Sequence, residues 1–393
     1  MYLDLNTAKK ARSKDAANRY FSLKVATDRV FCNRETELKV LTDSITANEH
    51  VVVVAPRRYG KTSLIMRAIT VTNQPYAMID LFCVSYQEEV ARKLAKAVTE
   101  ITRQFMGKLR KKTKTIFDTL DGIFRSANIS FKSDGLEVSL DFSQKQNPVN
   151  QIEDLLSGLE KLARKMNKKA ILFMDEFQDI LKTDDSNKIQ SAIRSIAQHS
   201  KNITYLFSGS SRTMLSTIFE DANQPLYLMC RKILLKRITA NKLSEHTRHA
   251  WMECNNQDVN DETMGTILDL TKRHTYYYNH LCLALISNQK TIDPSSVSKT
   301  WDRIVDDEIR KIVSELQSLT PNQIKVLTHV SLKGTINKPN SQEFLNDLGM
   351  PLSSLQRSIS SLLDADYLFK DEHGALTITD PAIHHFLYNR FEG

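Results

Sequence analysis

The stretch that decides the fold is Val51-Val52-Val53-Val54-Ala55-Pro56-Arg57-Arg58-Tyr59-Gly60-Lys61-Thr62-Ser63. Its four β-branched residues predict a buried strand of a parallel sheet. A turn containing Gly60 follows, and Lys61 opens a run with the apolar spacing of a helix. Because the N–H groups of such a turn and helix start converge on one point, this strand–loop–helix unit predicts a phosphate-binding loop.

The whole loop supplies candidate nucleotide contacts, namely Ala55, Pro56, Arg57, Arg58, Tyr59, Gly60, Lys61, Thr62 and Ser63. Lys61 would act on the β- and γ-phosphates, and the Thr62 hydroxyl would be a ligand of Mg²⁺. Ala55 occupies the position of the first glycine in the pattern G-x-x-x-x-G-K-[ST]. Because alanine is the smallest replacement, we expect the turn to form with a negative φ at Ala55.

A second apolar run, at 169–174, ends in Asp175 and Glu176. A buried strand that releases two acids at its carboxyl end has the arrangement of a Walker B motif. Asp175 is the candidate Mg²⁺ ligand, mostly through water. Glu176 is the candidate base that polarises the water attacking the γ-phosphate. A chance Gly-Lys-Thr and a strand with a polar end are the alternatives, and finding both motifs together favours a site for ATP and Mg²⁺.

The composition is that of an ordinary soluble globular chain, with 393 residues, 41% hydrophobic and 25% charged. Its length allows two or three domains. It contains no apolar run of membrane-spanning length and no secretory signal, so no membrane partner is expected. The five cysteines are scattered, odd in number and without C-x-x-C spacing, which predicts reduced thiols and a cytoplasmic location.

The segment Phe31-Cys32-Asn33-Arg34-Glu35-Thr36-Glu37-Leu38 precedes the loop by about twenty residues, with Asn33 as a plausible helix N-cap. Together with the loop and the run Asp175-Glu176-Phe177-Gln178, it resembles the archaeal-type ATPases. These belong to the AAA+ branch shared by signal-transducing NTPases and origin-recognition-type initiators. In that branch the first segment lies near the adenine. The resemblance therefore makes Val30, Phe31 and Arg34 candidate contacts of the base or ribose.

The resemblance also implies a strand at 203–207 between the two motif strands, with a γ-phosphate sensor at its end. Ser210 is the first candidate for this sensor and Arg212 the next, with Ser208 also in range. A polar strand end with a helix N-cap is the structural alternative. Arg231 closes a segment similar to the family's P-L-Y-x-R motif. It is a candidate to complete a site, its own or a neighbour's, and a structural ion pair is the default.

Residues 241–313 predict four helices that would form a lid. The family's Gly-His-Pro-Tyr-Tyr turn is replaced by Arg273-His274-Thr275-Tyr276-Tyr277, so the resemblance does not by itself imply a contact between the lid and the nucleotide at that turn. Arg273 is a candidate second sensor, and the tyrosines at 276–278 are expected in the core.

The segment 319–393 predicts three helices and a hairpin, the topology of a winged helix. Its third helix would read DNA through Ser353, Ser354, Gln356 and Arg357. That helix has one basic residue, however, and residues 315–393 carry six basic and nine acidic side chains, although the whole chain has a net charge of +8. Because DNA binding draws on lysine and arginine, a protein-docking role fits the segment at least as well.

We therefore predict an α/β fold: a P-loop NTPase parallel sheet of AAA+ type, a helical lid and a C-terminal winged helix. The predicted parts are a basic arm at 1–29, an ATPase domain at 30–239 with a hairpin insertion at about 128–142, a lid at 240–315 and a winged helix at 316–393. The predicted function is ATP hydrolysis that drives or switches contacts with DNA or a protein partner. The alternatives are a nucleotide switch with little turnover, whose winged helix docks a protein, and a DNA-binding regulator with structural ATP. Basic clusters in the arm and at 108–114 are further candidate DNA contacts, and self-association is open.

Overall fold

The computed structural model describes residues 18–25, 32–107, 123–124, 129–131, 138–140, 147–288, 292–370 and 374–392. Val30, Phe31, the basic cluster at 108–114 and most of the basic arm lie outside these ranges. The chain divides into two compact units, each with its own hydrophobic core. One unit holds Glu35–Ala55 and Leu64–Leu235, and the other holds Met1–Arg34, Pro56–Ser63 and Lys236–Gly393.

The first of these units is built on a five-stranded sheet whose paired strands are all parallel. The strands stand in the order β2-β5-β6-β1-β7. Their bounds are β1 Val51–Val54, β2 Tyr76–Asp80, β5 Ala170–Asp175, β6 Ile203–Gly209 and β7 Arg231–Leu234. The strand β6 lies between the two motif strands, as expected. Because the strands are parallel, the carboxyl ends of β1, β5 and β6 meet at one edge of the sheet.

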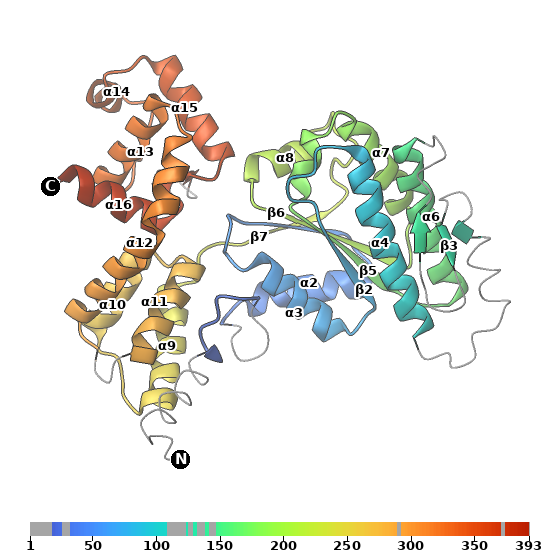
Figure 1. Ribbon diagram of the computed structural model, residues 1–393, viewed down its shortest axis with the longest axis horizontal. Coiled ribbons are helices and arrows are strands. Elements are labelled where there is room, and N and C mark those ends of the chain that lie inside the picture. Colours follow the sequence, from blue (N-terminus) through green and yellow to red (C-terminus); the bar gives the residue numbers. More distant parts are fainter. Residues whose placement is uncertain are drawn as a thin grey trace. The chain divides into compact units, whose positions relative to one another are not determined.

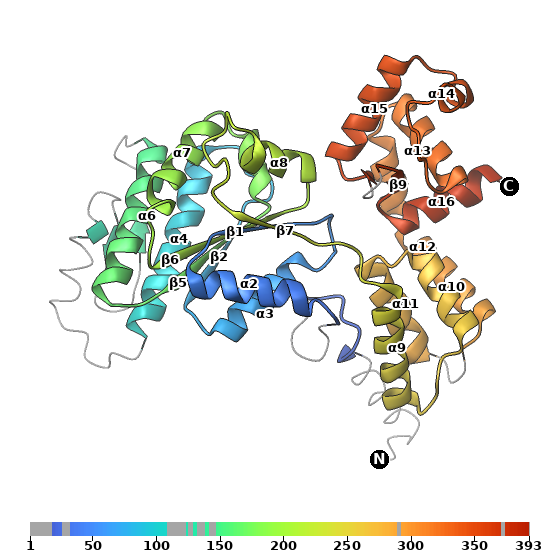
Figure 2. The same ribbon diagram turned by 180° about the vertical axis from the view of Figure 1, so that it is seen from behind.

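Helices cover both faces of this sheet (Figure 1). The helices α4 (Gln87–Met106), α6 (Pro148–Lys165) and α7 (Ser186–Ala197) lie on one face. The helices α2 (Glu35–Ala47) and α3 (Lys61–Thr72) lie on the other face, as the reverse view also shows (Figure 2). A 3₁₀ helix, η3 (Phe177–Lys182), follows β5, and α8 (Arg212–Glu220) follows β6. The predicted doubly covered parallel sheet is therefore confirmed.

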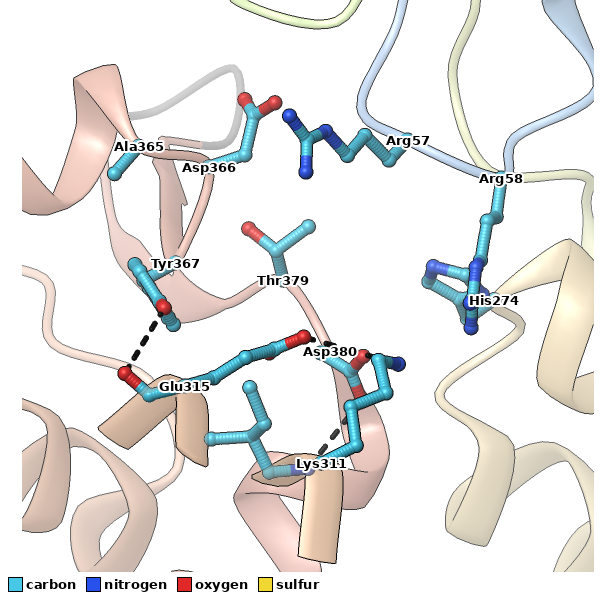
Figure 3. A pocket seen from close by; sticks show the side chains of 11 residues that line it. Arg57, Arg58, His274, Lys311, Glu315, Ala365, Asp366, Tyr367, Thr379 and Asp380 are labelled. Atoms are coloured by element: carbon cyan, nitrogen blue, oxygen red, sulfur yellow. Dashed lines mark hydrogen bonds and ion pairs between the residues drawn. The ribbon is translucent and has the colours of Figure 1, made fainter. Parts of the chain in front are cut away.

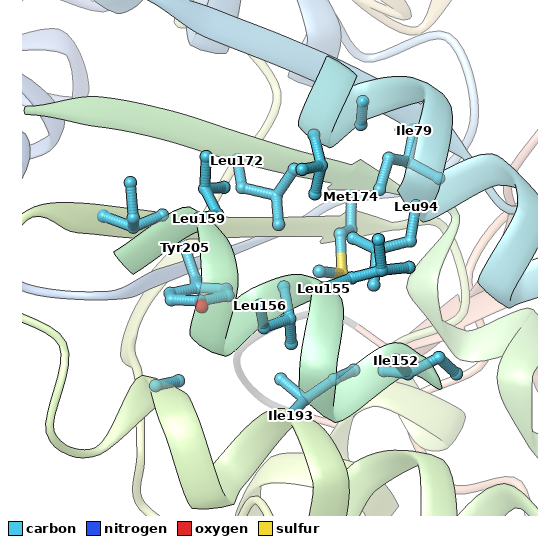
Figure 4. Close-up of a cluster of buried hydrophobic side chains, with 14 of the residues drawn as sticks. Ile79, Leu94, Ile152, Leu155, Leu156, Leu159, Leu172, Met174, Ile193 and Tyr205 are labelled. Atoms are coloured by element: carbon cyan, nitrogen blue, oxygen red, sulfur yellow. The ribbon is translucent and has the colours of Figure 1, made fainter. Parts of the chain in front are cut away.

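The core between the sheet and α4, α6 and α7 is dense and apolar (Figure 4). Alternate strand residues such as Leu172, Met174 and Tyr205 face Leu94, Leu155 and their neighbours on these helices. Strands β1, β5 and β6 are buried along their whole length. This explains why they appear in the sequence as continuous apolar runs without alternation.

The predicted hairpin insertion is present as two short antiparallel strands, β3 (Ile129–Phe131) and β4 (Val138–Leu140). Ile129 pairs with Leu140 and Phe131 with Val138. The residues between the strands lie outside the described ranges.

The other unit contains the four predicted lid helices: α9 (Ala240–Asn255), α10 (Asp261–Thr271), α11 (Thr275–Asn288) and α12 (Pro294–Gln317). Tyr277 and Tyr278 are fully buried beside Trp251 and Trp301, which confirms their expected place in the core. Asp293 caps α12 through a capping box with Ser296, and proline follows it at the helix start. That signal fixes the beginning of the longest described helix.

The winged helix is also present in this unit, and its elements are α13 (Pro321–Lys333), α14 (Gln342–Leu348), α15 (Leu352–Asp364), β8 (Leu368–Lys370), β9 (Leu376–Ile378) and α16 (Pro381–Glu392). Helix α16 was not expected from the sequence. It packs against α12 and α13, and one hydrophobic cluster runs through the lid and the winged helix together. None of the described helices is both long and apolar enough to span a membrane.

Candidate functional site

The phosphate-binding loop has the backbone that its sequence requires. Gly60 has a φ of 89°, in a region that glycine enters without strain. Ala55 has no positive φ, as expected, and its N–H donates to the carbonyl oxygen of Gly209 at 3.4 Å. Arg58 takes a left-handed backbone with a φ of 63°. The missing first glycine is therefore tolerated because the turn places its left-handed residues at Arg58 and Gly60.

Lys61 begins helix α3 and is almost fully buried, with 6% of its surface exposed. Its Nζ atom donates to the carbonyl oxygen of Pro56 at 3.4 Å, so the side chain curls back over the loop. Thr62 and Ser63 follow in the first turn of the same helix. The positive end of a helix dipole at this point favours an anion.

The two acids of the second motif leave the end of β5 as predicted. Asp175 is buried, and its carboxylate accepts a hydrogen bond from the Ser208 hydroxyl and one from the Glu176 N–H at 3.0 Å. Glu176 has a left-handed backbone, with a φ of 48°. This turn sends the two neighbouring carboxylates to different partners.

The carboxylate of Glu176 is held by three donors. Its Oε2 atom accepts from the Ser210 N–H at 3.1 Å, from the Ser210 hydroxyl at 2.9 Å and from the Gln178 side-chain amide at 2.6 Å. Strand β6 and the residue that follows it therefore offer one serine to each acid, Ser208 to Asp175 and Ser210 to Glu176. The structure brings Ser210, the first candidate sensor, into direct contact with the candidate base.

Gln178 is a residue of this site that our reading of the sequence missed. It is buried in η3, and its side-chain oxygen packs against Gly209 so closely that a Cβ atom there would overlap it. The run Asp175-Glu176-Phe177-Gln178 carries the family resemblance, but the resemblance assigns no role to Gln178. The signal that could have found Gln178 is a polar side chain two residues after the candidate base, in a segment that must turn.

Arg212 and Arg231 lie in different surroundings. Arg212 is the first residue of α8, directly after Ser211, whose hydroxyl accepts from the Met214 N–H at 3.3 Å and so caps the helix. Arg231 is the first residue of β7 and pairs with Val51, the first residue of β1. It therefore lies at the amino ends of the strands, whereas the phosphate-binding loop follows the carboxyl end of β1. Its side chain pairs with Glu49 at 3.4 Å. Within its unit the structure does not bring Arg231 to the ends of β5 and β6.

Arg34 is buried, and its guanidinium donates to the carbonyl oxygen of Lys236 at 2.6 Å. Both Asn33 and Arg34 have positive φ, and α2 begins only at Glu35. The residue that directly precedes the helix is therefore Arg34, and the expected N-cap at Asn33 is wrong. The described contact anchors Arg34 to the backbone, while Val30 and Phe31 lie outside the described residues.

Residues of the altered turn in the lid contact the phosphate-binding loop. The His274 and Tyr59 rings meet edge to face with centroids 5.0 Å apart. The guanidinium of Arg58 lies over the Tyr276 ring at 4.2 Å. Burial, then the nearby charges of Arg237 and Arg58, lower the pKa of His274 to about 3, so this ring is neutral at physiological pH. Arg273, the candidate second sensor, donates to the carbonyl oxygen of Ile238 at 3.4 Å.

The Thr62 hydroxyl and the Asp175 carboxylate remain the predicted Mg²⁺ ligands, and both are oxygen donors of the kind that Mg²⁺ prefers. No group of three or more His, Cys, Asp or Glu side chains within the described ranges could enclose a metal ion.

Comparisons with known proteins agree with this geometry. A family model described as an ATPase domain predominantly from Archaea matches residues 31–277, and one described as a probable winged helix domain matches residues 312–389. No curated protein matches the chain. The fold is similar to that of the Walker-type ATPase paby2304 of Pyrococcus abyssi, at 17% identity and a TM-score of 0.68 over 91% of this chain and 96% of that one. It is also similar to the ORC2 protein of Aeropyrum pernix in its ADPNP–ADP complexes, at 11% identity and a TM-score of 0.57 over 95% and 96%.

Proposed function

Because the chain belongs to the family of ATPase domains found predominantly in Archaea, and is therefore a nucleotide-binding ATP hydrolase, we propose that its turnover depends on Glu176 and switches contacts of the winged helix. The observation that carries this proposal is the three-donor hold on the Glu176 carboxylate at the end of β5. A base that orients water must itself be oriented, and three directional hydrogen bonds do this.

The residues of the loop and of the strand ends take separate roles in this proposal. Lys61 and the N–H groups at the start of α3 bind the β- and γ-phosphates. Thr62 and Asp175 hold Mg²⁺, which supplies charge neutralisation when it is bound. Glu176 accepts a hydrogen bond from the attacking water and polarises it toward the γ-phosphate. Ser210, in contact with Glu176, is the residue through which the γ-phosphate is sensed.

Two glutamates of the same unit provide a matched test. Glu176 and Glu153 each accept a hydrogen bond from a serine hydroxyl, from Ser210 at 2.9 Å and from Ser195 at 3.0 Å, but Glu153 is exposed on α6. We expect Glu176→Gln to lower kcat at least about a hundredfold, because a general base contributes about 10²–10⁴ in rate, and to leave ATP binding intact. Glu153→Gln should match the wild type. Unchanged hydrolysis in Glu176→Gln, measured at saturating ATP, would falsify the assignment of the base.

Lys61→Ala tests the loop in the same way. It should abolish Mg²⁺-dependent ATP binding measured by calorimetry, because Lys61 is the buried cation of the loop. Lys169→Ala is the control, since Lys169 is exposed and also donates to a backbone carbonyl, that of Thr46 at 3.1 Å. ATP binding without turnover in the wild-type chain would favour the alternative of a regulatory switch.

We propose that the winged helix contacts a protein partner and not DNA. The exposed face of α15 carries Ser353, Gln356 and Arg357, and Arg357 is the only basic residue in that helix. Its guanidinium also donates to the carbonyl oxygen of Ser353 at 3.2 Å. DNA binding relies on lysine and arginine side chains that contact phosphates. A helix with one such side chain therefore offers a weak surface for DNA.

Duplex DNA tests this assignment directly. We expect DNA to bind weakly and to leave hydrolysis unchanged, with Arg357→Gln behaving as the wild type. Tight binding that weakens steeply with salt and is lost in Arg357→Gln would overturn the protein-docking assignment in favour of DNA.

A further inference from the structure

Arg237 follows β7 and joins three parts of one unit. Its Nε atom donates to the hydroxyl of Tyr59 in the phosphate-binding loop at 2.9 Å. Its terminal nitrogens donate to the carbonyl oxygen of Lys272 at the end of α10, at 2.7 Å, and to that of Thr379 after β9, at 3.4 Å. The guanidinium also lies over the Phe369 ring of β8, 4.8 Å from its centre. One side chain thus contacts the loop, the lid, strand β8 of the wing and the residue that follows β9.

The position of Tyr59 makes the first of these contacts important. Tyr59 directly precedes Gly60 and Lys61, and only 3% of its surface is exposed. The buried, neutral ring of His274 packs edge to face against the Tyr59 ring. Because Tyr59 is held by both Arg237 and His274, it cannot shift without disturbing the lid. The loop residue next to the phosphate-binding glycine therefore has its side chain fixed by residues that come from elsewhere in the chain.

A cavity of about 230 Å³ lies beside this junction (Figure 3). Arg57 and Arg58 of the loop stand on one side of it, and Lys311, Asp380 and other residues of α12 and the winged helix stand on the other. Thr379 is among the residues that line the cavity, and Arg237 donates to its carbonyl oxygen as well as to the Tyr59 hydroxyl. Arg237 therefore joins the loop to the wing beside this cavity. Figure 3 also shows Arg57 pointing from the loop toward Asp366.

We infer that Arg237 is a positioning residue that couples the nucleotide-binding loop to the wing of the winged helix. It holds Tyr59 through its Nε atom and the wing through Thr379 and Phe369. A change of the loop on nucleotide binding moves the Tyr59 hydroxyl, and the rigid guanidinium transmits that shift to the wing. Such coupling is reciprocal. If the nucleotide changes the affinity of the wing for a partner by some factor, that partner changes the affinity for the nucleotide by the same factor. This inference rests on the proposed nucleotide binding and adds the route by which the output is controlled.

The test is hydrogen exchange of the wing peptides at 366–379, with and without saturating Mg²⁺ and a non-hydrolysable ATP analogue. In the wild type we expect the nucleotide to slow exchange there. In Arg237→Gln this protection should be lost even at saturating nucleotide, and the dissociation constant should rise about five- to tenfold, a typical size for coupling between sites. At saturating ATP, kcat should stay within about twofold of the wild type, because Arg237 makes its described contacts to Tyr59, the lid and the wing.

Two further variants separate coupling from general damage. Tyr59→Phe keeps the ring against His274 but removes the hydroxyl, so it should reproduce the loss of wing protection. The double variant should be no worse than Arg237→Gln alone, because Arg237→Gln already removes the bond to the Tyr59 hydroxyl. Arg248→Gln is the matched control, since Arg248 in the same unit also bonds a backbone carbonyl, that of Val259 at 3.3 Å, and pairs with Asp261.

Three outcomes decide the matter. Loss of wing protection in both Arg237→Gln and Tyr59→Phe, with Arg248→Gln unchanged, supports the coupling role. Nucleotide binding with unchanged wing protection in Arg237→Gln overturns the inference alone. A wild-type chain that binds no nucleotide overturns the proposed function, and the inference with it.

Discussion

Ser210 donates to one oxygen of Glu176 twice, through its N–H at 3.1 Å and through its hydroxyl at 2.9 Å. The N–H bond is fixed by the backbone at the end of β6, whereas the hydroxyl bond can be exchanged for another acceptor. In the proposed function, Ser210 would pass its hydroxyl from Glu176 to a γ-phosphate oxygen while its N–H still holds the glutamate. This exchange would link phosphate sensing to the position of the proposed base.

We expect Ser210→Ala to lower kcat by about tenfold, because one directional hydrogen bond to the base is lost while the backbone bond remains. The affinity for ATP should stay within about twofold, since this serine is expected to matter after binding. Steady-state hydrolysis and calorimetric binding check the two quantities. Ser195→Ala, which removes the exposed hydroxyl that contacts Glu153, serves as control. A tenfold loss of affinity with unchanged kcat would contradict this role.

Gly209→Ala should act on the base through Gln178. The added Cβ atom would overlap the Gln178 side-chain oxygen and come within 2.9 Å of a Leu215 methyl carbon, so the amide must move away from Glu176. We expect Gly209→Ala and Gln178→Ala to lower kcat by similar factors, and the double variant to be no slower than the worse single one.

Gly265→Ala in α10 is the control for the glycine change, because a Cβ atom there meets nothing within 4 Å. Full additivity in the double variant would show that Gly209 acts by a route other than Gln178. Hydrolysis rates at saturating ATP decide between the two outcomes.

Arg231→Ala should leave ATP affinity and turnover unchanged in dilute protein. The side chain lies at the edge of the sheet away from the ends of β5 and β6, and it pairs with Glu49 on the surface. Such an exposed pair contributes about 0–1 kcal/mol to the free energy of unfolding. If turnover rises with protein concentration in the wild type and this rise is absent in Arg231→Ala, the arginine completes a neighbour's site instead.

Acid should destabilise the unit that contains His274. Its folded pKa of about 3 lies below the ordinary value of 6.5, so the unfolded chain takes up a proton first as the pH falls. The stabilising effect is full above pH 6.5 and is lost between 6.5 and 3. Burial also lowers the pKa of His384, to about 4, and it therefore acts in the same direction.

Between pH 7 and pH 5.5 the free energy of unfolding should fall by about 1 kcal/mol less in His274→Gln than in the wild type. The reason is that a histidine with a pKa lowered on folding contributes about 1.4 kcal/mol per pH unit. Urea unfolding at the two pH values measures this difference. Equal losses in His274→Gln and the wild type would show that His274 is not the group being protonated.

The sequence was sufficient to place strands β1, β5 and β6 and the two motifs, whereas β7 begins and ends earlier than the predicted 233–238. The runs at Val51–Val54 and Ala170–Asp175 are buried on both faces, and such strands have a pattern that few other elements share. Glu176 and Ser210 could be named as neighbours only through the order of strands, which the family resemblance supplied. Their shared hydrogen bonds depend on the left-handed backbone of Glu176, which nothing in its residue type signals.

Helix α16 and the role of Arg237 were missed for different reasons. Asp380 caps α16 by accepting from the Ala382 N–H at 2.8 Å, with Pro381 at the helix start, so the sequence did contain a usable signal. Arg237 gives no such signal. Its partners Tyr59, Lys272 and Thr379 are far apart in the chain, and only tertiary packing brings them together.

The single core that runs through the lid and the winged helix has a consequence for how the protein can be taken apart. Ile312 and Leu316 on α12 are buried in this shared core. A chain that ended before α13 would therefore expose a hydrophobic patch on α12 to water. Such a fragment should aggregate instead of behaving as a free-standing ATPase. In the intact chain the lid and the winged helix share this core and should move as one rigid body. A partner that displaces α15 would therefore displace α11 as well.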